Sequence, residues 1–241
     1  MQIKRIWTVI KKLFNDIWTA IKKLFSDIWI AIKKLFRNIW IAIKKLRKKI
    51  LTAIVKLIKR IWIAIVKLFG WRLILPEKGS RQEFERCVFV VAPHTSIADF
   101  LVGVAYLWSC CSNGKVFVKK EFFRWPLGSI LRELGAISVD RGNIRNNMVG
   151  TAVSEFEKEN FSIAMTPEAT RKPVKYWKRG FWEIAHRANV AIVPTYIDFS
   201  KKEIGAFDTV MPSEDYEADL KKVRSLYRAG MAKHPEKFIE L

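Results

Sequence analysis

The chain has 241 residues, 50% of them hydrophobic, which is enough for one domain with its own core and a further segment. Its net charge of +21 is uneven, because residues 1–69 carry 18 lysines and arginines against two aspartates, a charge of +16. The three cysteines form no spaced pairs and no metal-ligand pattern with the three histidines. We therefore expect a reducing compartment, no disulfide framework and no metal site.

Residues 4–69 consist of an eleven-residue tandem repeat, x-x-Ile-Trp-x-Ala-Ile-Lys-Lys-Leu-Phe, which occurs six times. Eleven residues make almost three helical turns, so each copy falls on nearly the same side of a helix as the last. The apolar positions then cover about 160° of the circumference, and the lysines lie opposite. The sequence therefore predicts one amphipathic helix, about 100 Å long, over residues 1–69. Ile30, Ile41 and Ile63 interrupt the polar side and indicate a second contact surface.

An apolar face with Trp and Phe opposite a lysine-rich face is typical of a helix that lies in a membrane interface. The positive charges favour an anionic surface, at about 1 kcal/mol for each residue near it. Charged residues recur every few positions, so residues 1–69 predict neither a signal peptide nor a membrane-spanning helix. Self-association as a coiled coil or bundle is the main alternative interpretation. Nucleic-acid binding is a weaker alternative, and we do not expect it because the aromatic residues lie opposite the charge.

Residues 70–81, which contain Pro76 and Gly79, predict a linker between this helix and a domain at 82–241. In the domain, short β-branched and apolar runs alternate with helical patterns. The expected strands are 87–92, 116–118, 136–139, 162–165 and 190–197, and the expected helices are 97–109, 121–134, 145–158, 177–188 and 214–230. This alternation is typical of an α/β domain with a mainly parallel or mixed sheet flanked by helices.

His94 and Asp99 lie where the apolar run 87–92 gives way to the next apolar segment. A histidine is able to act as a base near neutral pH, and a carboxylate bonded to its second ring nitrogen fixes its tautomer. Five residues apart on one helix the two side chains would not face each other. They would do so if the histidine lay in the preceding turn and the aspartate in the first helical turn. A structural interpretation is also open, since Ser96 and Asp99 fit a helix capping box.

Three further strand ends carry residues suited to a site. Asp140 and Arg141 follow one strand, and arginine matches a pair of phosphate oxygens well. Glu168 and Arg171 follow the next strand after a proline, and the last apolar strand ends in Pro194. Each acid and arginine pair alone is more often a solvated ion pair. Their order after the histidine motif nevertheless indicates a shared site.

With these four blocks in order, the sequence resembles the 1-acylglycerol-3-phosphate acyltransferase family of glycerolipid acyltransferases. The family's blocks are His-x4-Asp, Gly-x4-Asp/Glu-Arg, Phe-Pro-Glu-Gly-Thr-Arg and an apolar strand that ends in proline. Here they correspond to residues 94–99, 135–141, 166–171 and 190–194. The resemblance covers about half of the chain and does not include the repeats. Two residues depart from the pattern, because Thr166 replaces the aromatic residue and Ala169 replaces the glycine of the third block.

The resemblance implies direct acyl transfer from acyl-CoA or acyl-carrier protein to the hydroxyl of a lysophospholipid, most of all 1-acylglycerol-3-phosphate, to give phosphatidate. In this mechanism the histidine removes the hydroxyl proton, the aspartate orients the imidazole, and an arginine of the second block binds the acceptor phosphate. The implied site residues are the catalytic His94 and Asp99 and the substrate-binding Arg141, Glu168, Arg171 and, more weakly, Lys120. No cofactor is implied beyond the thioester co-substrate.

No serine or cysteine lies in a recognisable nucleophile setting, so we expect no covalent acyl-enzyme. A lysolipid and its product reside in a bilayer, which predicts a cytoplasmic protein held peripherally on the inner face of a membrane by its basic helix. A second function remains open: a membrane-remodelling or scaffold protein with a weakened acyltransferase domain, for which Ala169 is the only indication. Residues 213–241 predict a helix that packs on the domain, and no chemistry.

Overall fold

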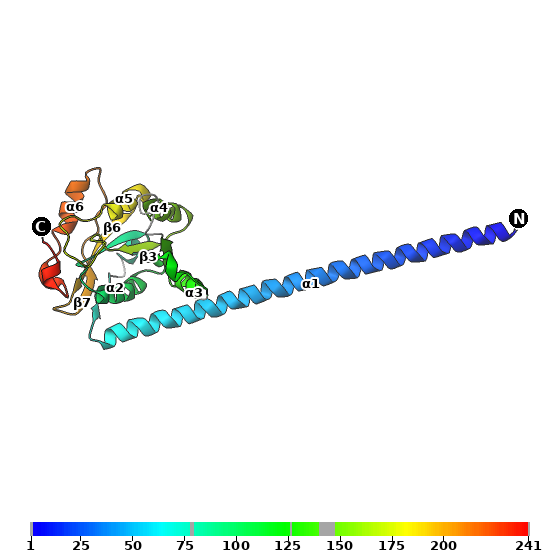
Figure 1. Cartoon of the computed structure of the whole chain (residues 1–241), viewed down its shortest axis with the longest axis horizontal. Helices are drawn as coiled ribbons and strands as arrows, with labels where there is room; N and C mark the ends of the chain where they lie inside the picture. Colours follow the sequence, from blue (N-terminus) through cyan, green and yellow to red (C-terminus); the bar gives the residue numbers. More distant parts are fainter. Residues whose placement is uncertain (1, 78–79, 126, 140–147, 241) are drawn as a thin grey trace. The chain divides into compact units, whose positions relative to one another are not determined.

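The computed structural model describes residues 2–77, 80–125, 127–139 and 148–240, and the chain divides into two compact units, Met1–Ala53 and Ile54–Leu241 (Figure 1). One uninterrupted helix, α1 (Gln2–Leu68), makes up the first unit and continues into the second. The long N-terminal helix predicted from the eleven-residue repeat is therefore confirmed.

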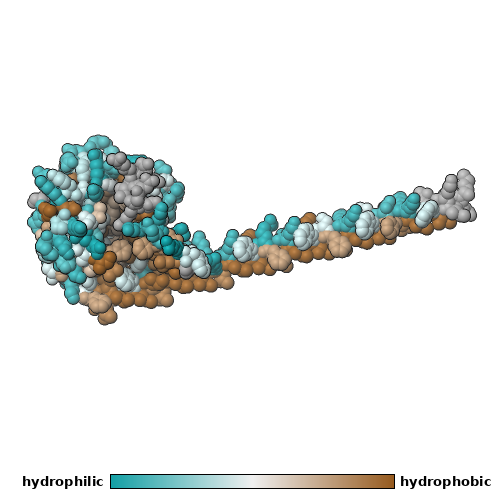
Figure 2. All heavy atoms as spheres, viewed as in Figure 1, coloured by the Kyte–Doolittle hydropathy of each residue, from teal (hydrophilic) through white to brown (hydrophobic). Residues whose placement is uncertain are grey.

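The repeat gives the first unit an amphipathic surface. Its large apolar side chains are exposed, with Trp18 at 52% and Phe25 at 69%. Figure 2 shows a brown stripe of hydrophobic residues along one side of the helix, with polar residues opposite. At the eighth repeat position a lysine lies over the tryptophan four residues earlier, as Lys33 does at 5.1 Å from the centre of the Trp29 ring. The charged groups therefore border the apolar stripe.

No helix in the described part of the chain is long and apolar enough to cross a membrane.

Seven strands form one sheet in the second unit, in the order β1-β7-β6-β2-β5-β3-β4. The strands are β1 Arg72–Leu73, β2 Cys87–Ala92, β3 Gly114–Lys119, β4 Ala136–Val139, β5 Ser162–Met165, β6 Ala191–Asp198 and β7 Glu203–Ala206. Neighbouring strands from β6 to β4 are parallel, whereas β6 and β7 are antiparallel. The predicted α/β class with a mainly parallel sheet is confirmed. Strands β1 and β7 were not predicted. β1 has only two residues, too few to show a pattern, and β7, Glu203–Ala206, contains a glutamate and a glycine and no apolar run.

The helices of the second unit follow the predicted order with shifted ends. They are α2 Ile97–Cys110, α3 Leu127–Glu133, α4 Met148–Lys158, α5 Gly180–Ala188 and α6 Tyr216–Arg224. The expectation of a helix from residue 121 was wrong, because a short 3-10 turn, Lys120–Phe122, comes first and Pro126 disfavours a helical conformation in the residue before it. Helix α6 stops at Arg224 instead of residue 230, and the chain continues in short 3-10 turns.

Two cores form on the two faces of the sheet, because successive residues of the buried strand β2 point to opposite sides. Val88 and Val90 pack with side chains of α4, α5 and α6, while Phe89 and Val91 pack with α2. Figure 1 shows α2 on one side of the strands and α4 and α5 on the other. All six residues of β2 are buried, as expected for a central parallel strand covered on both faces.

The last turns of α1 belong to the second unit, and a change in the repeat explains their packing. Valine replaces the eighth-position lysine in the last two copies, and Val55 and Val66 are only 4% and 5% exposed. Ile63, which interrupts the polar side, packs against the same core as Val66, whereas Ile30 is 61% exposed. The second contact surface predicted from Ile30, Ile41 and Ile63 is therefore present at Ile63, whereas Ile41, like Ile30, is exposed. The compact unit begins at Ile54, within the segment that the sequence assigned to the helix alone.

Candidate active site

The candidate site lies at the carboxyl ends of β2 and β5, which are parallel neighbours in the sheet. His94 follows β2 in the turn before α2, and Glu168 follows β5. The carboxyl ends of adjacent parallel strands open at the same edge of a sheet, which is the usual position of a ligand site in an open α/β fold. The first and third blocks of the sequence therefore meet in space.

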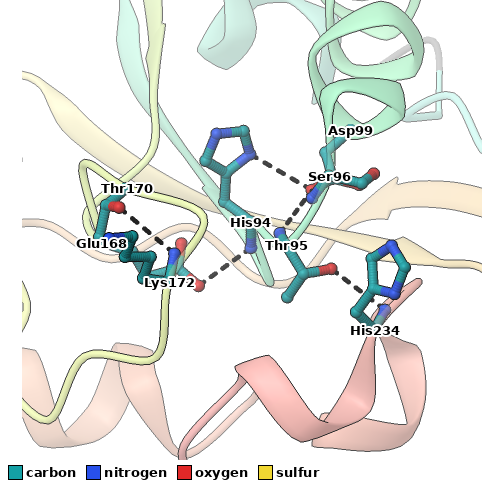
Figure 3. Close-up of polar contacts among 8 residues, drawn as sticks. All are labelled: His94, Thr95, Ser96, Asp99, Glu168, Thr170, Lys172 and His234. Atoms are coloured by element: carbon teal, nitrogen blue, oxygen red, sulfur yellow. Dashed lines mark hydrogen bonds and ion pairs between the residues drawn. The ribbon is translucent and has the colours of Figure 1, made fainter.

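His94 and Asp99 face each other across the start of α2 (Figure 3). The imidazole Nδ1 atom lies 3.3 Å from Asp99 Oδ2, but this contact does not have hydrogen-bond geometry, and Nδ1 has no hydrogen-bond partner among the described residues. This separation is long for a hydrogen bond, as is common in unliganded active sites. The arrangement favours the tautomer with the proton on Nδ1, which leaves Nε2 free to accept a proton. The His94 side chain is 17% exposed, so that nitrogen remains accessible.

Three hydrogen bonds hold the Asp99 carboxylate. It accepts the backbone N–H groups of Thr95 and Ser96 at 2.6 and 2.7 Å, and the Ser96 hydroxyl at 2.6 Å. Burial alone would raise the pKa of Asp99, but the neighbouring His94 and the hydrogen bonds from Ser96 outweigh it and hold the pKa below its usual value. The capping-box interpretation and the orienting interpretation therefore describe the same carboxylate, since Asp99 caps α2 and faces the imidazole.

Glu168 supports the histidine from the opposite side. Its Oε1 atom accepts the backbone N–H of His94 at 2.9 Å, and its side chain is 5% exposed. Burial raises the pKa of Glu168 to about 7, although the hydrogen bond from His94 opposes the shift. Its second oxygen, Oε2, has no hydrogen-bond partner in the described part of the chain. Glu168 therefore touches the main chain of His94 and not the imidazole.

A pocket of about 320 Å³ opens beside the histidine turn. Its wall consists of Thr95, Thr170, Arg171, Lys172, Pro173 and Lys237. Three of these six side chains are cationic, two carry hydroxyl groups and none is acidic. Such a wall is suited to a phosphate group.

Two other residues predicted from the sequence, Arg141 and Lys120, are not found in the pocket wall formed by the described residues. Arg141, the expected phosphate ligand, lies outside the described residues. Lys120 follows β3, two strands from β2, and is not part of the pocket wall formed by the described residues. Gly135, which begins the second block, has φ +94, and a Cβ there would lie 2.2 Å from the Gly114 carbonyl oxygen. That glycine is therefore required by the close approach of the chain before β4 to the start of β3.

The sequence missed the contribution of the C-terminal segment, which it assigned no chemistry. Lys237 lies 66 residues after Arg171, yet both line the pocket. No spacing or motif in the sequence connects them, since the contact arises only through the tertiary fold. Among the described residues, no group of three His, Cys, Asp or Glu side chains could hold a metal ion.

Comparison with protein families matches residues 76–198 to a family described as Acyltransferase. The matched segment contains His94, Asp99, Glu168 and Arg171 and ends with strand β6. No curated protein sequence matches the chain.

Proposed function

The chain belongs to the acyltransferase family, and we propose that it transfers an acyl chain from a thioester donor to the hydroxyl of a lysophospholipid. The donor is acyl-CoA or acyl-carrier protein, and the favoured acceptor is 1-acylglycerol-3-phosphate, which gives phosphatidate. The observation that carries the proposal is the placement of His94 against Asp99, 3.3 Å apart, with Nε2 of the imidazole open. This is the arrangement of an oriented general base.

The proposed reaction is a single displacement. His94 Nε2 takes the proton of the acceptor hydroxyl while the hydroxyl oxygen attacks the thioester carbonyl carbon. The tetrahedral intermediate collapses, the carbon–sulfur bond breaks, and the thiolate leaves with the proton carried by the imidazolium. The products are an ester and a free thiol. Asp99 stabilises the imidazolium that forms between the two proton transfers, because its carboxylate is ionised and buried beside Nδ1.

The membrane is the proposed site of action. The exposed apolar stripe of α1 in the first unit, bordered by lysines, supports binding to an anionic bilayer surface. A lysophospholipid acceptor and its product both reside there. We propose a peripheral position on the cytoplasmic face, with α1 as the anchor. Self-association through the same stripe is the competing role for this helix.

The decisive assay is the release of free thiol from acyl-CoA on anionic vesicles, with and without 1-acylglycerol-3-phosphate. We expect release that requires the acceptor and that falls by about 10²–10⁴-fold in His94→Ala, the usual contribution of a general base. The variant should bind vesicles like the unmodified protein. Folded, vesicle-bound protein that releases no thiol from CoA or carrier-protein donors would contradict the proposal and favour the scaffold interpretation.

A truncation tests the anchor. Deletion of residues 1–53 removes the exposed repeats and keeps Val55 and Val66 in the domain, whereas deletion of 1–69 would remove part of the core. We expect the shorter protein to lose vesicle binding and activity on bilayers but to keep activity on acceptor dispersed in detergent. Full activity on bilayers would contradict the anchoring role.

A further inference from the structure

We propose that Lys237, from the C-terminal segment, completes a binding site for the phosphate monoester of the acceptor and thereby selects the acceptor headgroup. The inference rests on the proposed function, and it assigns a substrate-binding role outside the segment that matches the family. The site is the pocket of about 320 Å³ lined by Lys237 together with Arg171 and Lys172.

The C-terminal segment is fixed against the active-site turn. The backbone N–H of His234 donates a hydrogen bond of 3.2 Å to the Thr95 hydroxyl oxygen (Figure 3). Thr95 directly follows His94 and is 2% exposed. The 3-10 turn Pro235–Lys237 comes immediately after His234. Lys237 is therefore held beside the histidine turn by a contact between backbone and side chain.

Arg224 links the loop that carries Arg171 to the C-terminal segment that carries Lys237. Its Nη1 atom donates a hydrogen bond of 2.7 Å to the Lys175 carbonyl, and Nη2 donates one of 3.0 Å to the Ile239 carbonyl. Lys175 belongs to the loop that carries Arg171, and Ile239 lies two residues after Lys237. Arg224 is 6% exposed, so these two hydrogen bonds are buried. The loop and the C-terminal segment thus hold a defined separation, and the cations that they carry converge on a preformed site.

The charge of the pocket wall is unbalanced. Within the described part of the chain, no carboxylate lies within ion-pair distance of Arg171, Lys172 or Lys237. The hydroxyl oxygens of Thr95 and Thr170 accept backbone N–H groups, which leaves both hydroxyl protons to be donated. A phosphate monoester carries a charge of about −1.5 to −2 at neutral pH, more than the single charge of a phosphodiester. Three converging cations therefore favour the monoester.

The position of the pocket fits the proposed acceptor. In 1-acylglycerol-3-phosphate, one methylene carbon separates the carbon that bears the free hydroxyl from the phosphate ester oxygen. A phosphate held beside Thr95 keeps that hydroxyl close to the neighbouring His94. The pocket therefore couples recognition of the phosphate to delivery of the hydroxyl to the base.

The test compares Lys237→Gln with Lys233→Gln, a matched change in the same segment at a lysine that lies outside the pocket, over the Phe199 ring. We expect Lys237→Gln to raise KM for 1-acylglycerol-3-phosphate about tenfold, with kcat and the donor KM unchanged. Its KM for lysophosphatidylglycerol, a phosphodiester, should change much less. Lys233→Gln should behave like the unmodified protein. An unchanged KM for the monoester in Lys237→Gln would overturn the proposal.

A second experiment tests whether the pocket binds the phosphate of the acceptor or that of the donor, since CoA also carries phosphate groups. A raised donor KM in Lys237→Gln that disappears when acyl-pantetheine replaces acyl-CoA would assign the pocket to CoA and overturn the acceptor assignment. Should the unmodified protein transfer no acyl group, the proposed function fails, and calorimetry with inorganic phosphate then tests the pocket alone. Phosphate binding that Lys237→Gln weakens and Lys233→Gln does not would support the site, and equal binding would overturn it.

Discussion

Glu168 Oε1 accepts a hydrogen bond of 2.9 Å from the backbone N–H of His94, and this contact joins the third sequence block to the first. The carboxyl group is 5% exposed, and its Oε2 atom has no hydrogen-bond partner among the described residues. Glu168 therefore positions the main chain that carries the proposed base. Because it is buried without a neutralising cation in contact, its ionisation costs stability.

The first prediction concerns this cost. Burial raises the pKa of Glu168 from 4.5 to about 7, so the folded protein binds more protons than the unfolded chain between these values. The contribution of Glu168 to the free energy of unfolding should therefore fall by about 3 kcal/mol as pH rises from 4.5 to 7, and stay constant above. Glu168→Gln, which keeps an acceptor oxygen for the His94 N–H, removes this dependence.

Chemical denaturation of both proteins across this pH range measures the effect. The stability of Glu168→Gln relative to the unmodified protein should increase between pH 4.5 and 7. Glu157→Gln, a change at an exposed residue of α4, serves as the control and should show no such trend. The same stability difference at pH 5 and pH 8 would contradict the assigned protonation of Glu168.

A second prediction separates orientation from capping at Asp99. Asp99→Asn removes the negative charge beside His94 Nδ1, so we expect kcat to fall about a hundredfold or more with little change in KM. Ser96→Ala is the matched control, because it removes the 2.6 Å hydroxyl bond to Asp99 and leaves both backbone bonds to the carboxylate. Steady-state thiol release should show a loss of less than about fivefold in this control. Equal losses in the two variants would mean that Asp99 serves only the helix cap.

Much of this fold was predictable because the central strand β2 is fully apolar and its neighbour β6 begins with an apolar run. The run at β2, buried at all six positions, is distinct in the sequence, and so are the helices with amphipathic faces. By contrast, β1 and β7 are short, and the side-chain ion pair between Arg72 and Glu203 that accompanies their pairing joins residues 131 positions apart. Strand pairing of such short segments depends on the tertiary fold, which a local pattern does not contain.

The site also contains residues that local sequence predicted and residues whose positions depend on the tertiary fold. His94 and Asp99 are five residues apart, so the sequence predicted that they face each other provided that the histidine lay in the turn before the helix. The hydrogen bond from His94 to Glu168 spans 74 residues and depends on β2 and β5 being neighbours, which the sequence did not specify. Lys237 was missed for the same reason. Arg141 stays a prediction, because it lies outside the described residues.

Ala169 carries the third prediction. The family resemblance places glycine here, and Ala169 has φ 56, in the left-handed region where a Cβ is strained. Ala169→Gly should raise the free energy of unfolding by about 0.5–1 kcal/mol, after the added flexibility of the unfolded chain is deducted. The value of kcat should change by less than about twofold, because the loop already has this backbone conformation without glycine.

Thermal or chemical denaturation, with thiol release in parallel, tests Ala169→Gly. Lys202→Gly is the control for relief of strain elsewhere, since Lys202 has φ 51 and lies outside the pocket. It should stabilise the protein similarly and leave activity unchanged. A large rise of kcat in Ala169→Gly alone would show that alanine weakens the site, as the scaffold interpretation requires. A loss of stability would contradict the strain argument.

The last prediction concerns the replacement of lysine by valine in the final repeats. Val66 is 5% exposed in the core that contains Phe89 and Val102, whereas Leu68, two residues later, is 85% exposed. Val66→Lys restores the consensus residue of the repeat but buries an unpaired ammonium group, so we expect the free energy of unfolding to fall by about 3 kcal/mol. Leu68→Lys should change it by less than about 0.5 kcal/mol. Denaturation curves for the two variants test this, and equal effects would show that the last turns of α1 do not pack in the domain.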